Sequence, residues 1–310
     1  MTTTVEQLLQ QMEKELVGQR QNIRLLLTAL VAGGHVLLEG VPGIGKTKMV
    51  KTLSELMGGE SKRVQFTPDM MPSDIIGHVV FNMQQNQFET IKGPVFANLL
   101  LADEINRTPP KTQAALLEAM EEGQVTIHGV TYPLPDPFFV VATQNPVEYE
   151  GTYVLPEAQL DRFLFKLTMS YPSHENEKQI LAKHIPNKRS HECNQEPLFT
   201  WEAILEKRRQ LEEVVVDDSI LEYITTLIRN TRETKRLLLG ASSRAGIAVL
   251  MASKAWALLD NRKFVTPDDV KMVARPALRH RLILSPQVEL EGGTSDHIIE
   301  ETLAAIPVPR

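Results

Sequence analysis

Residues 35–57 read HVLLEGVPGIGKTKMVKTLSELM: an apolar run, a glycine-rich stretch and a helical pattern in direct succession. Short apolar runs that alternate with helical patterns are typical of a parallel sheet that helices cover on both faces. Four more such runs follow before residue 170, at residues 63–66, 99–103, 138–143 and 163–168. The alternation predicts an α/β fold built on a parallel sheet.

The pattern changes near residue 171, beyond which apolar residues recur only at helical spacing. We expect two domains, an α/β domain over residues 1–172 and an all-helical domain over residues 173–310. The motif Thr266-Pro267-Asp268-Asp269 is typical of a helix start, with Thr266 as the cap. Two helical faces are expected to pack in this second domain: Ile220, Ile224, Leu227 and Ile228, and Ile247, Leu250, Met251, Ala255, Leu258 and Leu259.

Two segments interrupt the first domain, at residues 77–92 and 124–134. Each has apolar stretches around a polar centre, which predicts a β-hairpin. The hairpins are either loop ornament or protruding elements that contact a partner, and the sequence leaves both interpretations open.

The composition excludes several classes of protein. The chain has 310 residues with 33 Lys or Arg and 39 Asp or Glu, so the formal net charge of −6 provides no global attraction to nucleic acid or anionic membrane. Cys193 is the only cysteine, which excludes a disulfide framework and a thiolate zinc site within one chain. Because the sequence shows neither a signal-peptide pattern nor an apolar run of membrane-spanning length, we expect a cytoplasmic protein.

Residues 40–47 (GVPGIGKT) fit the phosphate-loop pattern G-x-x-x-x-G-K-[ST], with a strand before it and a helix after it. Glycines let the backbone wrap closely around phosphates, and the N–H groups of a helix N-terminus favour anions. We expect Lys46 to contact the β- and γ-phosphates of ATP and Thr47 to be a ligand of Mg²⁺. The residues expected to bind the nucleotide in this segment are Gly40, Pro42, Gly43, Ile44, Gly45, Lys46, Thr47 and Lys48.

A pair of acidic residues, Asp103 and Glu104, directly follows the apolar run LLLA. We expect Asp103 to hold Mg²⁺ through its water shell and Glu104 to act as the general base on an attacking water. A carboxylate next to a metal ligand favours hydrolysis over transfer to a bulky acceptor.

Taken together, these blocks resemble a MoxR-type AAA+ ATPase, and the likeness runs from about residue 5 to the C-terminus. It is carried by the phosphate loop and by blocks in a specific order: LADEINR at 101–107 with PPKTQ at 109–113, ATQNP at 142–146, LPEAQLDRF at 155–163, GASSRA at 240–245 and FVTPDDVKMVARPALRHRLIL at 264–284. The resemblance implies an AAA+ nucleotide-binding domain followed by a helical lid domain.

The resemblance also implies roles for single residues. Asn145 matches the sensor-1 residue that orients the attacking water, and Arg244 matches the sensor-2 arginine of the lid. Arg162 matches the arginine finger, which reaches the γ-phosphate bound by the neighbouring subunit. Val17 and Gly18 resemble the segment that lines the adenine pocket. The resemblance suggests no definite role for Arg107.

Proteins of this type form rings, usually hexamers, and the resemblance implies the same for this chain. It further implies a chaperone-like function on protein clients, with a von Willebrand factor A domain protein on a separate chain as the expected partner. Two alternatives remain open: the ATPase motor subunit of a metal chelatase, and a nucleotide-dependent binding switch with little turnover.

Overall fold

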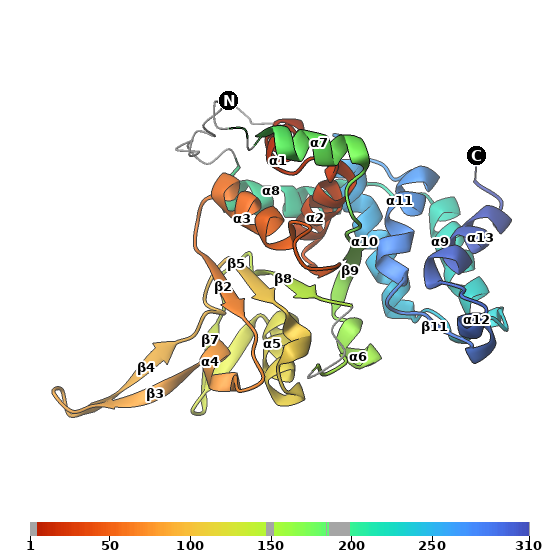
Figure 1. Cartoon of the computed structure of the whole chain (residues 1–310). Coiled ribbons are helices and arrows are strands. Elements are labelled where there is room, and N and C mark those ends of the chain that lie inside the picture. Colours follow the sequence, from red (N-terminus) through yellow and green to blue (C-terminus); the bar gives the residue numbers. More distant parts are fainter. Residues whose placement is uncertain (1–4, 147–151, 184, 186–198, 310) are drawn as a thin grey trace. The chain divides into compact units, whose positions relative to one another are not determined.

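The computed structural model describes residues 5–146, 152–183, 185 and 199–309, so Cys193 lies outside the described ranges (Figure 1). The chain divides into two compact units. The first unit comprises Met1–Arg24, Leu37–Leu155 and Leu167–Ile204, and the second comprises Leu25–Val36, Pro156–Lys166 and Leu205–Arg310. Residues 173–204 thus group with the first unit, and the boundary that we predict after residue 172 stays a proposal.

A five-stranded sheet has the order β2-β5-β8-β1-β9, and the pairings of β2 with β5 and of β5 with β8 are parallel. Strands β5 and β8 are almost wholly buried, as is expected of strands covered on both faces, whereas β2 forms an edge with alternating exposure. The strands are β1 (His35–Glu39), β2 (Ser61–Gln65), β5 (Leu99–Asp103), β8 (Phe139–Gln144) and β9 (Phe163–Thr168).

The five predicted strands are confirmed, and β2 and β8 are displaced by only one or two residues from the predicted bounds. Helices connect them along the chain. Those before residue 200 are α1 (Val5–Glu15), α2 (Arg20–Ala32), α3 (Lys46–Met57), α4 (Pro72–Ile76), α5 (Pro110–Glu122), α6 (Glu157–Leu160) and α7 (His174–Lys183).

Both predicted hairpins are present in the first unit. Strand β3 (Gly77–Asn82) pairs antiparallel with β4 (Gln87–Lys92), and β6 (Gln124–Ile127) pairs with β7 (Val130–Pro133). The Thr90 and Tyr132 hydroxyls lie 3.1 Å apart and connect the hairpins, while β3–β4 extends well away from the sheet (Figure 1). A contact between these hairpins and a partner stays a prediction.

The later part of the chain is mostly helical, as predicted, but the expectation that strands end near residue 171 is wrong in one detail. Strands β10 (Leu237–Leu239) and β11 (Ile283–Leu284) form a small antiparallel sheet. Two or three residues are too few to show a period-two pattern, so periodicity could not reveal them. The helices are α8 (Trp201–Gln210), α9 (Asp218–Glu233), α10 (Ser243–Leu259), α11 (Pro267–Leu278), α12 (Pro286–Leu290) and α13 (Ser295–Ala305).

The predicted packing face of α9 is buried, whereas that of α10 is only partly buried. The α9 face is confirmed, and so is the cap of α11, where Thr266 accepts from the amide of Asp269. The interpretation of Ile247 as a core residue is wrong, because its side chain is 62% exposed. The core contacts of this part of α10 come from residues such as Ala245 and Val249, which lie on another side of the helix.

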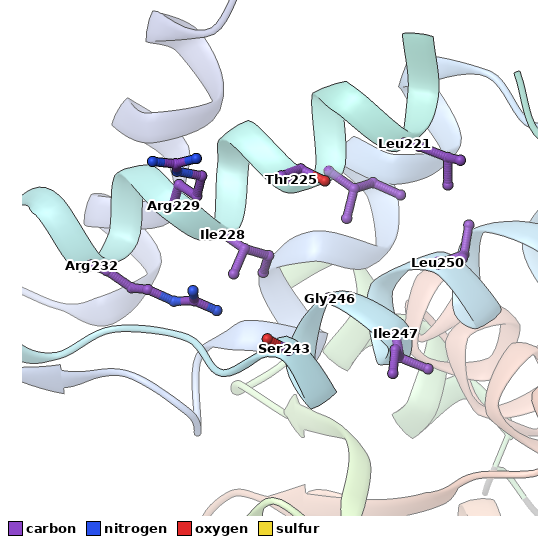
Figure 2. Close-up of a pocket in the computed structure, with 10 residues that line it drawn as sticks. Leu221, Thr225, Ile228, Arg229, Arg232, Ser243, Gly246, Ile247 and Leu250 are labelled. Carbon is purple, nitrogen blue, oxygen red and sulfur yellow. The ribbon is translucent and has the colours of Figure 1, made fainter. Parts of the chain in front are cut away.

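Ile247 instead lines a groove of about 320 Å³ between α9 and α10. Leu221 and Ile228 come from the α9 side, and Ile247 and Leu250 come from the α10 side (Figure 2). Helical spacing predicts that one face of a helix is apolar, but it does not predict whether another element covers that face. The prediction that Ile247 is buried was wrong for this reason.

Across the described parts of the chain, none of the helices has both the length and the hydropathy needed to cross a bilayer.

Candidate nucleotide site

The phosphate loop connects β1 to α3 in the first unit. Gly43 and Gly45 have φ angles of +84° and +95°, which L-residues rarely adopt, and no heavy atom lies within 4 Å of where a Cβ would stand. At Gly40 the requirement is different, because a Cβ there would lie 2.7 Å from the carbonyl oxygen of Met169. Glycine is therefore needed for backbone conformation at two positions and for space at the third.

Lys46 is the first residue of α3, and its side chain is nearly buried. Its Nζ donates to the carbonyl oxygen of Gly40 and, at 3.3 Å, to that of Gln144 at the end of β8. The ammonium group thus lies between the phosphate loop and the neighbouring strand end, where its charge favours an anionic ligand.

A cavity of about 500 Å³ adjoins the loop within the first unit. Six residues that we predicted to bind nucleotide line it: Val17, Pro42, Gly43, Ile44, Gly45 and Lys48. Its apolar lining includes Leu16, Tyr171, Ile180 and Leu181, which the sequence analysis did not identify. Gly18 lies between the lining residues Val17 and Gln19 with φ of +77°. A cavity with apolar walls beside a phosphate loop suits a ligand that has a flat base at one end and phosphates at the other.

Asp103 ends the buried strand β5, and its carboxylate is held by two hydroxyls from other elements. Thr47 Oγ1 donates to Oδ2 at 3.1 Å, and Thr143 Oγ1 donates to Oδ1 at 2.6 Å. The two residues that the sequence predicts as Mg²⁺ ligands, Thr47 and Asp103, therefore lie next to each other, and they present the hard oxygen atoms that Mg²⁺ prefers. Among the described residues, no group of three or more His, Cys, Asp or Glu side chains is placed to hold a metal ion.

Glu104 leaves the strand in the left-handed conformation, with φ of +59°, and its amide donates to Thr143 Oγ1 at 2.9 Å. Its Oε2 accepts two hydrogen bonds, one from Gln65 Nε2 at 2.7 Å and one from Arg107 Nη1 at 3.0 Å. The side chain is thereby oriented by β2 on one side and by the turn after β5 on the other.

Arg63 also belongs to this network, since its Nη2 donates to Asp103 Oδ2 at 2.8 Å. Four residues of the network were not assigned by sequence: Arg63, Gln65, Thr143 and Arg107. The alternation of polar and apolar residues in Arg63-Val64-Gln65-Phe66 could have identified the first two, because residues that are two positions apart in a strand share a face. Asn145, by contrast, was predicted, and it follows β8 with a side chain that is 4% exposed. The preceding Gln144 carbonyl accepts from the Gly40 amide at 3.3 Å, which fixes the backbone before Asn145 next to the loop.

The other two predicted arginines belong to the second unit. Arg162 directly precedes β9, and Arg244 lies in the first turn of α10 with Nε 3.8 Å from Asp161 Oδ2. Asp161 also accepts from Arg281 Nε at 2.5 Å, and Arg281 Nη2 donates to the carbonyl oxygens of Asp161 and Phe163 at 3.1 and 2.9 Å. Arg281 thus holds the residues on both sides of Arg162 in place by hydrogen bonds.

The carbonyl oxygen of Phe163 has a second neighbour, the buried ring of His280, whose Nε2 lies 3.0 Å away. Burial and the adjacent Arg281 guanidinium hold the pKa of His280 well below its usual value. The ring is therefore neutral, and it carries its proton on Nε2, which can donate to this carbonyl.

The Arg281→Met substitution is expected to destabilise the second unit by about 3–5 kcal/mol, because it leaves a partly buried carboxylate and several carbonyl oxygens without their donor. Urea unfolding followed by circular dichroism measures the change. The matched control is Arg275→Met, which removes an exposed ion pair with Glu300 and should cost at most about 1 kcal/mol. Equal losses in the two variants would contradict a structural role for Arg281.

Two family models match the sequence. The family described as "ATPase family associated with various cellular activities (AAA)" matches residues 35–165, and the "AAA lid domain" matches residues 229–302. Among curated proteins, the Bacillus subtilis protein YeaC is 50% identical, over 95% of this chain and 91% of its own length. The Mycobacterium tuberculosis protein "Chaperone MoxR1" is 39% identical, over 99% of this chain and 83% of its own length.

A solved structure shares the whole fold. The crystal structure of a "putative ATPase" from Cytophaga hutchinsonii superposes with a TM-score of 0.88 at 42% sequence identity, and it covers 99% of this chain and 95% of its own. Both the sheet-bearing and the helical parts of the chain therefore have counterparts in one solved protein.

Proposed function

This chain belongs to the MoxR family of AAA+ ATPases, and on that premise we propose that it hydrolyses ATP with Mg²⁺ and uses the energy to remodel protein clients. The observation that carries the proposal is the arrangement of the phosphate loop. The loop lines a cavity, and its Thr47 contacts Asp103, which precedes Glu104. Nucleotide binding alone would not require Glu104, whereas hydrolysis needs a base at that place.

The proposed chemistry assigns distinct work to each residue. Lys46 would neutralise phosphate charge, and Thr47 and Asp103 would hold Mg²⁺, which would supply further positive charge against the phosphates. Glu104 accepts the proton of the attacking water while Gln65 and Arg107 keep its Oε2 oriented. Asn145 orients that water.

We further propose that the site is shared between subunits. Arg162 would reach the nucleotide of the neighbouring protomer, and Arg244 would close over the nucleotide of its own chain. Such a site requires a closed ring, for which the family favours a hexamer. Val17 and Gly18 would contact the adenine.

The client is proposed to be a protein that carries a von Willebrand factor A domain on a separate chain. The name of the mycobacterial relative, a chaperone, supports a client of the protein class. The chelatase motor and the low-turnover switch stay as alternative predictions, and so does the cytoplasmic location.

The proposal is tested first at Lys46. Lys46→Ala is expected to weaken the binding of a non-hydrolysable ATP analogue about 10–100-fold, since it removes a charge-assisted contact to phosphate. Isothermal titration calorimetry in the presence of Mg²⁺ measures this. Lys51→Ala is the matched control, because Lys51 lies on the same helix with a side chain that is 75% exposed. Unchanged affinity in Lys46→Ala would contradict the proposed nucleotide site.

A further inference from the structure

Arg63 contacts the same oxygen of Asp103 that faces Thr47. Its Nε and Nη2 donate to Asp103 Oδ2 at 3.1 and 2.8 Å, while Thr47 Oγ1 donates to this atom at 3.1 Å. The other carboxylate oxygen, Oδ1, accepts from Thr143. A guanidinium group therefore lies against the one carboxylate oxygen that adjoins the phosphate-loop threonine.

The position of Arg63 follows from the sheet. Strands β2 and β5 are parallel neighbours, with Arg63 paired to Leu101 and Gln65 paired to Asp103. Residues 63 and 65 share one face of the edge strand, and Arg63 Nη2 also donates to Gln65 Oε1 at 3.3 Å. Three hydrogen bonds thus fix the guanidinium group in place, although 57% of the Arg63 side chain is exposed. An exposed side chain on an edge strand has room to move away when its partner is taken.

Asp103 Oδ2 already accepts two hydrogen bonds from Arg63 and one from Thr47, and the guanidinium charge repels a divalent cation beside it. Arg63 must therefore release Oδ2 before that oxygen can accept a hydrogen bond from a water molecule in the shell of a bound Mg²⁺.

We propose that Arg63 is a positioning residue that competes with the Mg²⁺ shell for Asp103 Oδ2, and so lowers the metal affinity of the site. This inference rests on the proposed function, since it assumes that Thr47 and Asp103 hold the metal. Arg63 itself takes no part in the chemical step.

The test uses Mn²⁺ as a paramagnetic substitute for Mg²⁺, with the full-length protein and ADP. The free Mn²⁺ signal in electron paramagnetic resonance is measured as protein–ADP complex is added. Arg63→Met, which keeps the length of the side chain and removes its charge, is expected to raise the Mn²⁺ affinity by at least about tenfold, because it removes two competing charge-assisted hydrogen bonds. Arg63→Lys keeps the positive charge but lacks the forked donors of arginine, so its Mn²⁺ affinity should lie between those of the wild type and Arg63→Met.

Two controls separate competition from other effects. Lys62→Met removes a neighbouring positive charge of β2 that forms an ion pair with Glu60 at 3.0 Å, so it should leave the Mn²⁺ affinity unchanged. Asp103→Asn should abolish the gain when combined with Arg63→Met, because the gain depends on that carboxylate. Circular dichroism verifies that each variant is folded.

The outcomes are distinct. A tenfold gain in Arg63→Met that is absent from the control variant and from Arg63→Met combined with Asp103→Asn supports the inference. Unchanged or weaker Mn²⁺ binding in a folded Arg63→Met protein that still binds ADP overturns it and leaves the proposed function standing. Failure of the wild-type protein to bind ADP at all overturns the proposed function, and the inference with it.

Discussion

Arg162→Ala is expected to lower ATP turnover by about 10³–10⁵-fold while the oligomer persists, the range that an arginine finger contributes in GTPases. An arginine is suited to this role because its guanidinium is always charged and its donors fork around phosphate oxygens. Steady-state phosphate release measures the rate, and sedimentation velocity measures the assembly. Arg229→Ala, at an exposed position of α9, is the control.

Mixing variants tests whether the arginine acts between subunits. Arg162→Ala protein has an intact phosphate loop, and Lys46→Ala protein has an intact arginine. If the site is shared, random mixed rings of the two inactive proteins recover activity at about a quarter of their interfaces. If Arg162 acts within its own chain, the mixture stays as inactive as its components. Full turnover in Arg162→Ala rings would remove the basis for the shared site.

Glu104→Gln is expected to lower ATP turnover by about 10²–10⁴-fold, the usual contribution of a general base, with nucleotide binding retained. The amide cannot accept a proton from water, but its carbonyl oxygen can still accept the hydrogen bonds from Gln65 and Arg107. The local geometry should therefore survive. Phosphate release and calorimetric binding of ATP together separate loss of chemistry from loss of binding.

Glu118→Gln is the matched control, since Glu118 lies exposed on α5. A purified oligomer that keeps full activity after Glu104→Gln would show that Glu104 is not the base. Because this variant should hold ATP without cleaving it, it also offers a way to identify the client: a protein retained by Glu104→Gln in the presence of ATP, and released by the wild type, is the expected partner.

The strands and the phosphate loop could be predicted because their signals are local. A short apolar run, a glycine pattern at fixed spacing and a helical pattern each depend on neighbours within about ten residues. The same holds for both hairpins. In the hairpin of β6 and β7, for example, His128 and Gly129 form the turn with positive φ angles. Features that depend on long-range packing were less predictable, as the exposed Ile247 shows.

The sequence by itself determined the α/β order of the first half, the helical second half, and the meeting of Thr47 with Asp103, since parallel strands that end at one sheet edge bring such residues together. Only the tertiary structure decided that Arg63 and Gln65 would hold Asp103 and Glu104, or that Arg281 would hold Asp161. These pairs are separated by about 40 to 120 positions, and their contacts depend on strand register and helix packing. A local sequence pattern cannot predict such a hydrogen bond, because packing of separate elements brings its donor and acceptor together.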